Sequence, residues 1–351
     1  MASKLQAGIS NEKDRCCMSV MIKESPISEK DMIAQAETAL ADISRVREGV
    51  GRVIFGQESA VERTLVALLA GGHALLVGVP GLAKTKLVET LGIVLGLDSR
   101  RIQFTPDLMP SDILGSEVME QDEFGKRSFR FISGPIFAQL LMADEINRAS
   151  PRTQSALLQS MQEYHVTIAG VRHDLPAPFH VLATQNPLEQ EGTYPLPEAQ
   201  LDRFLMQVDI LYPEIEAERR ILLETTGIED AKAQNVLQPA RLKEIQTLIR
   251  RMPVPESVVE AILQLVRSAR PGQGNAETDK HVAWGPGPRA SQSLTLCARA
   301  RALYDGRLAP SIDDIRALAE PVLQHRMALT FAARAEGTTV RDVVAKLAKG
   351  I

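Results

Sequence analysis

A glycine-rich string between an apolar run and a helical stretch constrains this chain more than any other feature. It reads Gly78-Val79-Pro80-Gly81-Leu82-Ala83-Lys84-Thr85, and it follows the apolar residues 74–77. Glycine lets a backbone approach phosphate groups closely, and the N–H groups of such a loop point at them. Strand, loop and helix in this order are the context that a phosphate-binding loop requires. We therefore expect ATP here, with Lys84 on the β- and γ-phosphates and Thr85 on Mg²⁺.

One position of this loop departs from the common pattern. Ala83 stands where the last glycine before the lysine is usual. A methyl group is small, so we expect Ala83 to fit the start of the following helix.

Short apolar runs separated by helical stretches predict the fold class. The runs cover residues 74–77, 102–105, 140–143, 179–184 and 204–210, and runs of this length suit buried strands of a parallel sheet. Helical spacing covers residues 31–50, 59–70, 84–95 and 151–162. The alternation predicts an α/β fold with helices on both faces of an open sheet.

Two segments interrupt this alternation, and the character of the chain changes after Tyr212-Pro213. Residues 115–134 and 166–172 have the short alternating stretches of hairpins, while helical patterns dominate after residue 212, broken by a Gly/Pro loop at 271–288. We expect a disordered extension at 1–28, an α/β nucleotide-binding core at 29–212 and a helical lid domain at 213–351.

Polar side chains follow two of the predicted strands at the edge where such sheets bind ligands. Asp144 and Glu145 end the run 140–143, and Asn186 follows the next run. We expect Asp144 to hold Mg²⁺, Glu145 to polarise the attacking water, and Asn186 to bond the γ-phosphate or that water. For Asn186, a simple turn before Pro187 is the alternative.

Several arginines are candidates for contacts with the phosphates. Arg203 enters the fifth strand and is the best candidate for a finger that acts on a neighbouring subunit's ATP. A salt bridge with Asp202 or Glu198 is the alternative for Arg203. Arg289 opens a later helix and is expected to reach the γ-phosphate of its own subunit; an arginine that simply starts a helix is the alternative. Two others, Arg148 and Arg152, are expected at a subunit interface, and the sequence leaves open whether they contact nucleotide.

Composition limits the class of partner and the compartment. The formal net charge is −4 and aromatic residues make up 4% of the chain, so a general attraction to nucleic acid is not expected. No apolar run is long enough for a membrane span. The three cysteines, Cys16, Cys17 and Cys297, do not suit a disulfide framework. These features predict a cytoplasmic protein.

Taken together, the motifs resemble the AAA+ ATPases and, among them, the MoxR family. The strings that carry the resemblance are GRVIFGQ at 51–57, QFTPDLMPSD at 103–112, DEINRA at 144–149, QSALL at 154–158 and EAQLDRF at 198–204. The match covers roughly residues 40–345, and Ala83 agrees with this family's own form of the loop. Residues 1–28 lie outside the match.

The resemblance implies several properties that the spacing of residues does not. It implies the sheet order 5-1-4-3-2, a lid behind the core, and an ATP site between neighbouring subunits. Phe55, Gly56 and Gln57 would lie against the adenine, and the two hairpins would be the helix-2 insert and the pre-sensor hairpin, facing a pore. It also implies a homo-hexamer with chaperone-like activity on protein clients, often beside a partner with a von Willebrand factor A domain.

Other functions stay open at this point. A nucleic-acid motor is one, because related proteins with similar hairpins act on DNA, although the acidic balance is against it. The ATPase subunit of a metal chelatase is another, since it shares the two hairpins. A small-molecule kinase is the weakest, because no separate acceptor pocket is evident.

Overall fold

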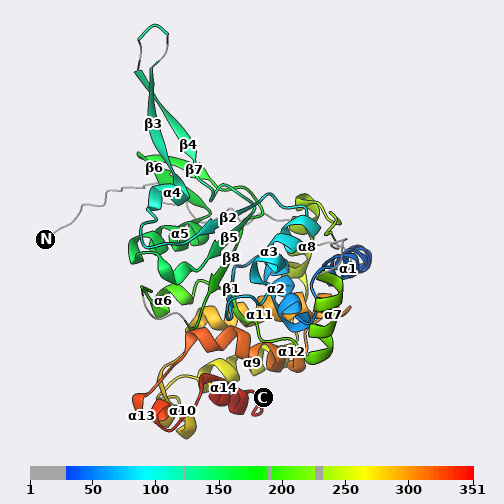
Figure 1. Ribbon diagram of the computed structural model, residues 1–351. Coiled ribbons are helices and arrows are strands. Elements are labelled where there is room, and N and C mark those ends of the chain that lie inside the picture. The colour runs from blue at the N-terminus through cyan, green and yellow to red at the C-terminus, as the bar shows by residue number, and fades with distance from the viewer. Residues whose placement is uncertain (1–28, 122, 126, 189–191, 226–231) are drawn as a thin grey trace, which may run out of the picture.

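A computed structural model describes residues 29–121, 123–125, 127–188, 192–225 and 232–351 (Figure 1). The extension predicted for residues 1–28 lies outside the described residues. Within those ranges, no helix combines the length and the apolar character needed to cross a membrane.

Five parallel strands form the central sheet. They are β1 (Ala74–Val77), β2 (Ser99–Gln103), β5 (Leu140–Asp144), β8 (His180–Gln185) and β9 (Met206–Asp209). The strands lie side by side in the order β2-β5-β8-β1-β9, and every neighbouring pair is parallel. Numbered in chain order, this is the predicted order 5-1-4-3-2.

Side chains of these strands alternate between two hydrophobic layers, as the two-residue period of a strand requires. Leu76, Leu140 and Leu182 belong to one layer, which includes buried residues of α1 (Glu29–Gly51), α2 (Glu58–Leu69) and α3 (Lys84–Val94). The intervening Leu75, Leu141 and Val181 belong to the other, with residues of α4 (Pro110–Leu114) and α5 (Pro151–Glu163). Helices therefore cover both faces, which confirms the predicted α/β class.

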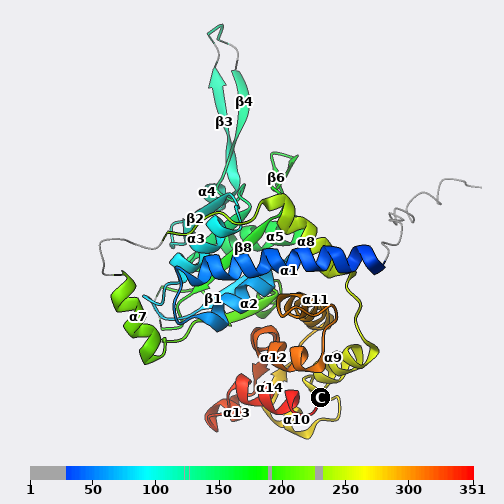
Figure 2. The ribbon, with the colours of Figure 1, turned by 90° about the vertical axis from the view of Figure 1, so that its right-hand side faces the viewer.

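Two antiparallel hairpins leave the core where they were predicted. The longer pairs β3 (Gly115–Gln121) with β4 (Arg127–Ser133), and the shorter pairs β6 (His165–Ile168) with β7 (Val171–Asp174). The longer hairpin projects far from the body of the molecule, on the side away from the C-terminal helices (Figures 1 and 2). The two hairpins contact each other where the ring of Phe131 in β4 stacks on His173 in β7, with ring centroids 4.0 Å apart.

The second strand starts earlier than predicted. The apolar run 102–105 marked it, but β2 covers Ser99–Gln103 and carries mostly exposed residues. It is the edge strand, paired with β5 alone. An edge strand of this kind tolerates polar residues, so hydrophobicity did not mark its start.

Helices dominate the C-terminal part of the chain. They are α7 (Ile215–Thr225), α8 (Pro239–Arg251), α9 (Glu256–Ser268), α10 (Ala276–His281), α11 (Pro288–Tyr304), α12 (Ile312–Leu323), α13 (Phe331–Ala335) and α14 (Val340–Ala348). A short ladder joins β10 (Val282–Trp284) to β11 (Ala328–Leu329). The predicted loop 271–288 was therefore wrong in part: α10 forms within it because the Asn275 side chain accepts hydrogen bonds from the N–H groups of Glu277 and Thr278.

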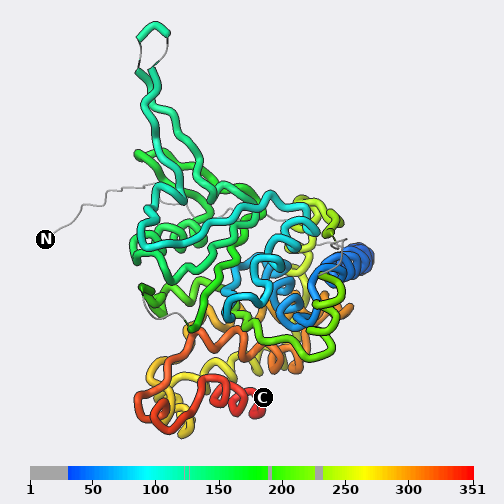
Figure 3. The backbone as a smooth tube through the Cα atoms, viewed as in Figure 1, coloured from blue at the N-terminus to red at the C-terminus, as the bar shows by residue number. Residues whose placement is uncertain are grey.

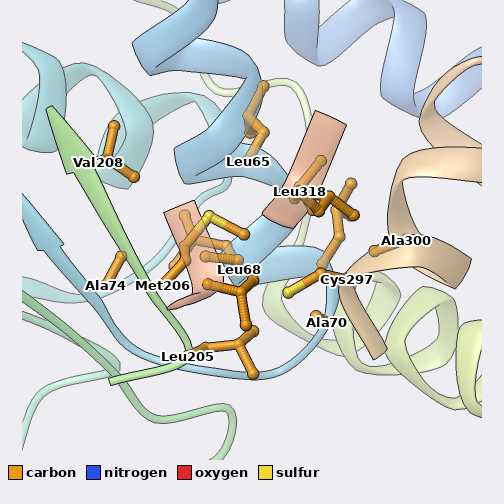
Figure 4. Packing of buried hydrophobic residues seen from close by; sticks show 14 of the residues in the cluster. Leu65, Leu68, Ala70, Ala74, Leu205, Met206, Val208, Cys297, Ala300 and Leu318 are labelled. Carbon is orange, nitrogen blue, oxygen red and sulfur yellow. The ribbon is translucent and has the colours of Figure 1, made fainter. Parts of the chain in front are cut away.

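Core and C-terminal helices share one hydrophobic cluster. Leu65 and Leu68 of α2 lie between Met206 of the sheet and Cys297 and Leu318 of the C-terminal helices (Figure 4). In the backbone trace, α9 to α14 lie against the lower side of the core (Figure 3). The sheet and the helices that follow it thus share one packed interior, and the predicted division at residue 212 stays a prediction.

Two buried histidines link the start of β1 to β8, and both are held in the neutral form. Nδ1 of His73 accepts from the N–H of Val181 at 2.9 Å, so its Nε2–H donates to the Met161 carbonyl at 3.1 Å. His180 donates from Nδ1 to the Gly72 carbonyl and accepts at Nε2 from Gln246. Burial, with the neighbouring His180, lowers the pKa of His73 to about 3, and burial lowers the pKa of His180 to about 4.

Mild acid is therefore expected to destabilise the fold. The unfolded chain takes up protons on these histidines below pH 6.5, whereas the folded chain does not until pH 4 or lower, so the free energy of unfolding falls as the pH drops. Each histidine costs about 2 kcal/mol between pH 7.5 and pH 5. Urea unfolding at the two pH values measures the loss, and His180→Gln should reduce that loss by about 2 kcal/mol. An unfolding free energy that is equal at both pH values would contradict this assignment.

Candidate functional site

The glycine-rich loop connects β1 to α3 and has one strained position. Gly81 has φ +84°, and Ala83, at the N-cap of α3, has φ +58° and ψ +23°. Ala83 does stand at the start of the helix, as expected, but its backbone is left-handed. An alanine in this conformation costs roughly 1–2 kcal/mol, which explains why glycine is usual at this position.

Close backbone packing fixes the start of the loop. A Cβ at Gly78 would lie 2.7 Å from the Ile210 carbonyl oxygen, so only glycine fits without a shift. The Lys84 ammonium donates to the carbonyls of Gly78 and Val79 at 2.6 and 2.8 Å. The lysine charge is therefore held inside the loop.

The acidic pair lies at the end of β5, as predicted. Asp144 is 7% exposed, and its Oδ1 accepts a 2.5 Å hydrogen bond from Thr184 Oγ1. Glu145 has φ +55°, a left-handed conformation that is strained for a glutamate, and its N–H donates to the same Thr184 Oγ1 at 2.9 Å. One threonine of the neighbouring strand thus holds both acidic residues, a role that the sequence did not predict.

Two residues of the edge strand also contact the acidic pair, and neither role was predicted from the sequence. Arg101 donates from Nε and Nη2 to Oδ2 of Asp144, at 3.1 and 2.5 Å. Gln103 donates to Oε2 of Glu145 at 2.7 Å, and Arg148 donates to the same oxygen at 3.0 Å. Arg101 and Gln103 are two residues apart on a strand paired with β5, so they share a face; only the correct strand boundary shows this.

The remaining predicted residues of this site converge on one pocket. Asn186 is buried, and its Oδ1 accepts from the Leu188 N–H at 3.1 Å, which is the turn that was kept as an alternative. It also lines a pocket of ≈ 380 Å³ together with residues of the loop and the acidic pair. The lining residues are Pro80, Gly81, Ala83, Lys84, Thr85, Lys86, Asp144, Glu145 and Asn186.

The segment expected against the adenine borders a second pocket at the same edge of the sheet. Gly56 packs so closely on α7 that a Cβ would lie 2.4 Å from Ala217 Cβ, and Gln57 donates to the Leu211 carbonyl at 2.8 Å. Phe55 lies under the Arg220 guanidinium, 4.7 Å from ring centroid to Cζ. Gly56 and Gln57 line a pocket of ≈ 680 Å³ beside Asp209, the last residue of β9.

The two arginines predicted to contact phosphates lie together, away from the loop. Arg203 and Arg289 both line a pocket of ≈ 260 Å³, which Arg250 of α8 also borders. Arg289 forms an ion pair with Asp202 at 3.6 Å. For Arg203 and Arg250, no hydrogen bond or ion pair joins the guanidinium to the part of the chain that the structure describes. The expected alternative, a salt bridge of Arg203 with Asp202 or Glu198, is therefore not formed.

This arginine pocket lies at the opposite edge of the sheet from the glycine-rich loop. It is lined by residues 70–73, which precede β1, whereas the loop follows β1. Four residues of strand separate the two edges, about 13 Å at about 3.3 Å per residue. The same-subunit role expected for Arg289 is therefore not the one that this geometry favours. Arg148 lies beside Glu145, and Arg152 is exposed at the start of α5.

Comparison with known proteins gives the same picture. Residues 73–206 match the model of the ATPase family associated with various cellular activities, and residues 275–347 match the AAA lid domain. "Chaperone MoxR1" of Mycobacterium tuberculosis is 44% identical over 297 residues, which are 84% of this chain and 78% of that protein. "Protein MoxR" of Methylorubrum extorquens is 30% identical over 306 residues, 82% of this chain and 87% of that protein.

A solved structure agrees with the fold as well as with the sequence. A crystal structure from Cytophaga hutchinsonii, classed as an ATPase, superposes with a TM-score of 0.85 and 38% identity. The superposition covers 92% of this chain and 98% of that one. With these identities over most of both chains, the chain belongs to the MoxR family of AAA+ ATPases.

Proposed function

We propose that this protein binds ATP with Mg²⁺ and hydrolyses it to ADP and phosphate, and that it uses the reaction to remodel or activate client proteins. The observation that carries the proposal is the pocket of ≈ 380 Å³, where Lys84, Thr85, Asp144, Glu145 and Asn186 meet at the carboxyl edge of the sheet. The pocket combines a cationic loop, two carboxylates and an amide. This combination suits a nucleoside triphosphate with a divalent cation.

Each residue has a role that follows from its position. The loop N–H groups and Lys84 would bind the phosphates, and the Thr85 hydroxyl and Asp144 would hold Mg²⁺, which would neutralise charge on the phosphate oxygens. Glu145 orients the attacking water and takes its proton. Asn186 has its Oδ1 bonded to the Leu188 N–H, so its amide N–H groups are its donors for the γ-phosphate.

The arginine pocket supplies the second half of the proposed active site, in trans. Arg203 and Arg289 lie too far from their own loop to act on it, so they serve the ATP of the next subunit in a ring. A head-to-tail arrangement closes such a ring, and we propose a homo-hexamer. Among the described residues, no carboxylate pairs with the Arg203 guanidinium, so the guanidinium is available to bind a phosphate of a neighbouring subunit.

The long hairpin supports protein clients over nucleic acid. Its exposed residues include Met119, Phe124 and Phe129, which are 53%, 95% and 72% exposed, and its described charges are of both signs. An apolar surface of this kind binds protein more readily than a phosphate backbone. A partner with a von Willebrand factor A domain and a cytoplasmic setting complete the proposal; the buried free thiol of Cys297 is consistent with a reducing compartment.

Two alternatives share the same ATP site. The ATPase subunit of a metal chelatase would act with a chelatase partner. Insertion of a metal into an acceptor would then require this protein and that partner together. A nucleic-acid motor would bind DNA with a steep dependence on salt. Binding to DNA that is weak and shows little salt dependence would exclude the motor.

Lys84→Ala tests nucleotide binding directly. The change removes the cation fixed inside the loop, and a charge-assisted contact contributes roughly 1.5–3 kcal/mol, so ATP should bind about ten- to a hundredfold more weakly. Titration calorimetry with Mg²⁺ and ATP measures the change. Lys280→Ala, a surface lysine paired with Glu336, is the matched control and should bind normally. Unchanged ATP affinity in Lys84→Ala would remove the basis of the proposal.

Arg101→Ala is expected to ease Mg²⁺ binding. The Arg101 guanidinium forms an ion pair with Asp144, so it competes with a cation for that carboxylate. The Arg101 side chain is half exposed but the Asp144 carboxylate is buried, so the pair is expected at the upper end of the range for surface pairs, about 1 kcal/mol. The Mg²⁺ concentration for half-maximal ATP binding should therefore fall about fivefold. Arg100→Ala, the preceding residue of the same strand, is the control and should leave it unchanged. A higher Mg²⁺ requirement in Arg101→Ala would show that Arg101 supports the site instead.

A further inference from the structure

A buried arginine of the C-terminal helices holds the segment that carries Arg203. Arg326 lies in the short helix η2 (Gln324–Arg326) and is 1% exposed, among the largest fully buried side chains of the described chain. Its Nε donates to Oδ1 of Asp202 at 2.8 Å. A buried guanidinium is costly unless all its N–H groups find acceptors, so its partners show what it is there to hold.

Most of those acceptors belong to the residues that flank Arg203. Nη2 donates to the carbonyls of Asp202 and Phe204 at 3.2 and 2.6 Å, and Nη1 donates to the Leu205 carbonyl at 3.2 Å. Its own domain supplies the rest, the Val322 carbonyl and Ser293 Oγ. One side chain therefore fixes the backbone on both sides of Arg203.

The preceding residue, His325, adds a hydrogen bond to the same segment, and we call the His325–Arg326 pair the clamp. His325 Nε2 lies 3.1 Å from the Phe204 carbonyl, and a carbonyl can only accept, so Nε2 carries the proton and donates. The ring is 5% exposed. The His325–Arg326 pair thus donates four hydrogen bonds to backbone carbonyls between Asp202 and Leu205.

Asp202 links the clamp to the second arginine of the pocket. Its carboxylate accepts from Arg326 on one oxygen and lies 3.6 Å from Arg289 on the other. The side chain of Arg203, between Asp202 and Phe204 in the chain, forms no such contact with the residues that the structure describes. Its position in the pocket is therefore set by the backbone that Arg326 holds.

We infer that Arg326 is a positioning residue for the neighbouring subunit's active site: it places Arg203 through the backbone of 202–205 and Arg289 through Asp202. The position of η2 in the C-terminal domain thereby determines whether the two arginines stand where the next subunit's phosphates arrive. This inference rests on the proposed action of Arg203 in trans. A misplacement of about 1 Å is enough to lower a rate by about 10²-fold.

A positioning role in trans can be separated from a merely structural one. A subunit changed at Arg326 keeps its own phosphate loop, Asp144 and Glu145 intact. What the change disturbs is the arginine pocket that this subunit presents to the next subunit. A neighbour with an unmodified arginine pocket should therefore restore hydrolysis at the phosphate site of the Arg326-changed subunit. A subunit damaged in its fold would stay inactive beside any neighbour.

The test uses Arg326→Lys, which keeps the charge but loses the planar fork of donors. We expect kcat to fall about 10²-fold with KM for ATP nearly unchanged. Rings that combine Arg326→Lys subunits with Lys84→Ala subunits should regain activity that neither has alone. Arg301→Lys is the matched control: Arg301 also bridges core and C-terminal helices, through Glu62 and Asp314, but it does not touch residues 202–205. Arg301→Lys should lower the free energy of unfolding and leave kcat nearly unchanged.

A second variant keeps the test decisive if Arg326→Lys does not fold. Asp202→Asn keeps the shape of the side chain and removes the charge shared by Arg326 and Arg289, and it should show the same loss and the same recovery on mixing. Folded rings that do not recover on mixing, or normal kcat in the variant that folds, would overturn the inference. If Arg203→Ala is itself fully active, the proposed action in trans fails first; if Arg203→Ala is inactive and these variants are active, only the inference fails.

Discussion

Arg203→Ala is expected to bind ATP nearly normally and to lose most of its turnover. The Arg203 guanidinium lies at the opposite edge of the sheet from its own phosphate loop, so its removal leaves the loop and the acidic pair intact. Arginine fingers contribute about 10³–10⁵ to the rate of related reactions, by stabilising charge that develops on the transferred phosphoryl group. Steady-state hydrolysis and ATP titration on the same preparation measure the two quantities.

A surface arginine provides the control for Arg203. Arg316 pairs with Asp313 on the outside of α12, and Arg316→Ala should hydrolyse ATP at the normal rate. If Arg203→Ala also hydrolyses ATP normally, Arg203 is not the finger, and Arg148 and Arg152 become the next residues to test.

Glu145→Gln is expected to keep ATP binding and to lower kcat by about 10²–10⁴, the usual contribution of a general base. Glutamine has the shape of glutamate and can still accept hydrogen bonds from Gln103 and Arg148, so the geometry around residue 145 should persist. What it cannot do is take a proton from water. Single-turnover hydrolysis of bound ATP measures the loss.

The Glu145→Gln protein can also be used to identify client proteins. A ring that holds ATP without hydrolysing it should retain proteins that the cycle normally releases, so affinity capture followed by identification of bound proteins is informative. Glu163→Gln, at the exposed end of α5, is the control for an unspecific effect of the substitution. Normal hydrolysis by Glu145→Gln would show that another group activates the water.

The sequence predicted the sheet because its buried strands are continuous apolar runs. β1, β5 and β8 are buried almost throughout, so hydrophobicity alone marks them. It failed for β2, whose exposed edge carries Ser99, Arg100 and Arg101. Neither could it show α10, a short helix that depends on the Asn275 cap more than on an apolar face.

The site was predicted where chemistry is local and missed where it depends on neighbouring strands. Lys84, Thr85, Asp144, Glu145 and Asn186 were predicted from loops and strand ends, and they line one pocket. The contacts of Arg101, Gln103 and Thr184 with the acidic pair require the register between strands, which sequence spacing does not contain. The left-handed backbone of Ala83 and Glu145 is set by the turns that they occupy, and their residue types disfavour it.

The placement of Arg289 depends on how the C-terminal helices pack on the core. Its helix, α11, packs against α2 as well as α9 and α12, which brings Arg289 to Asp202 and not to the phosphate loop. Long-range packing of this kind is invisible in a single sequence. This placement beside Asp202 is why we propose that Arg289 acts on a neighbour's ATP.

The central claim, that each ATP site is completed by the next subunit, is tested most directly by mixing two inactive proteins. Lys84→Ala keeps an intact arginine pocket, and Arg203→Ala keeps an intact phosphate site. Rings that contain both, isolated through a different tag on each, should recover hydrolysis up to about a quarter of the normal rate, because about one interface in four of a random head-to-tail ring joins the two intact halves. Mixed rings that remain as inactive as the two parent proteins would contradict an active site shared between subunits.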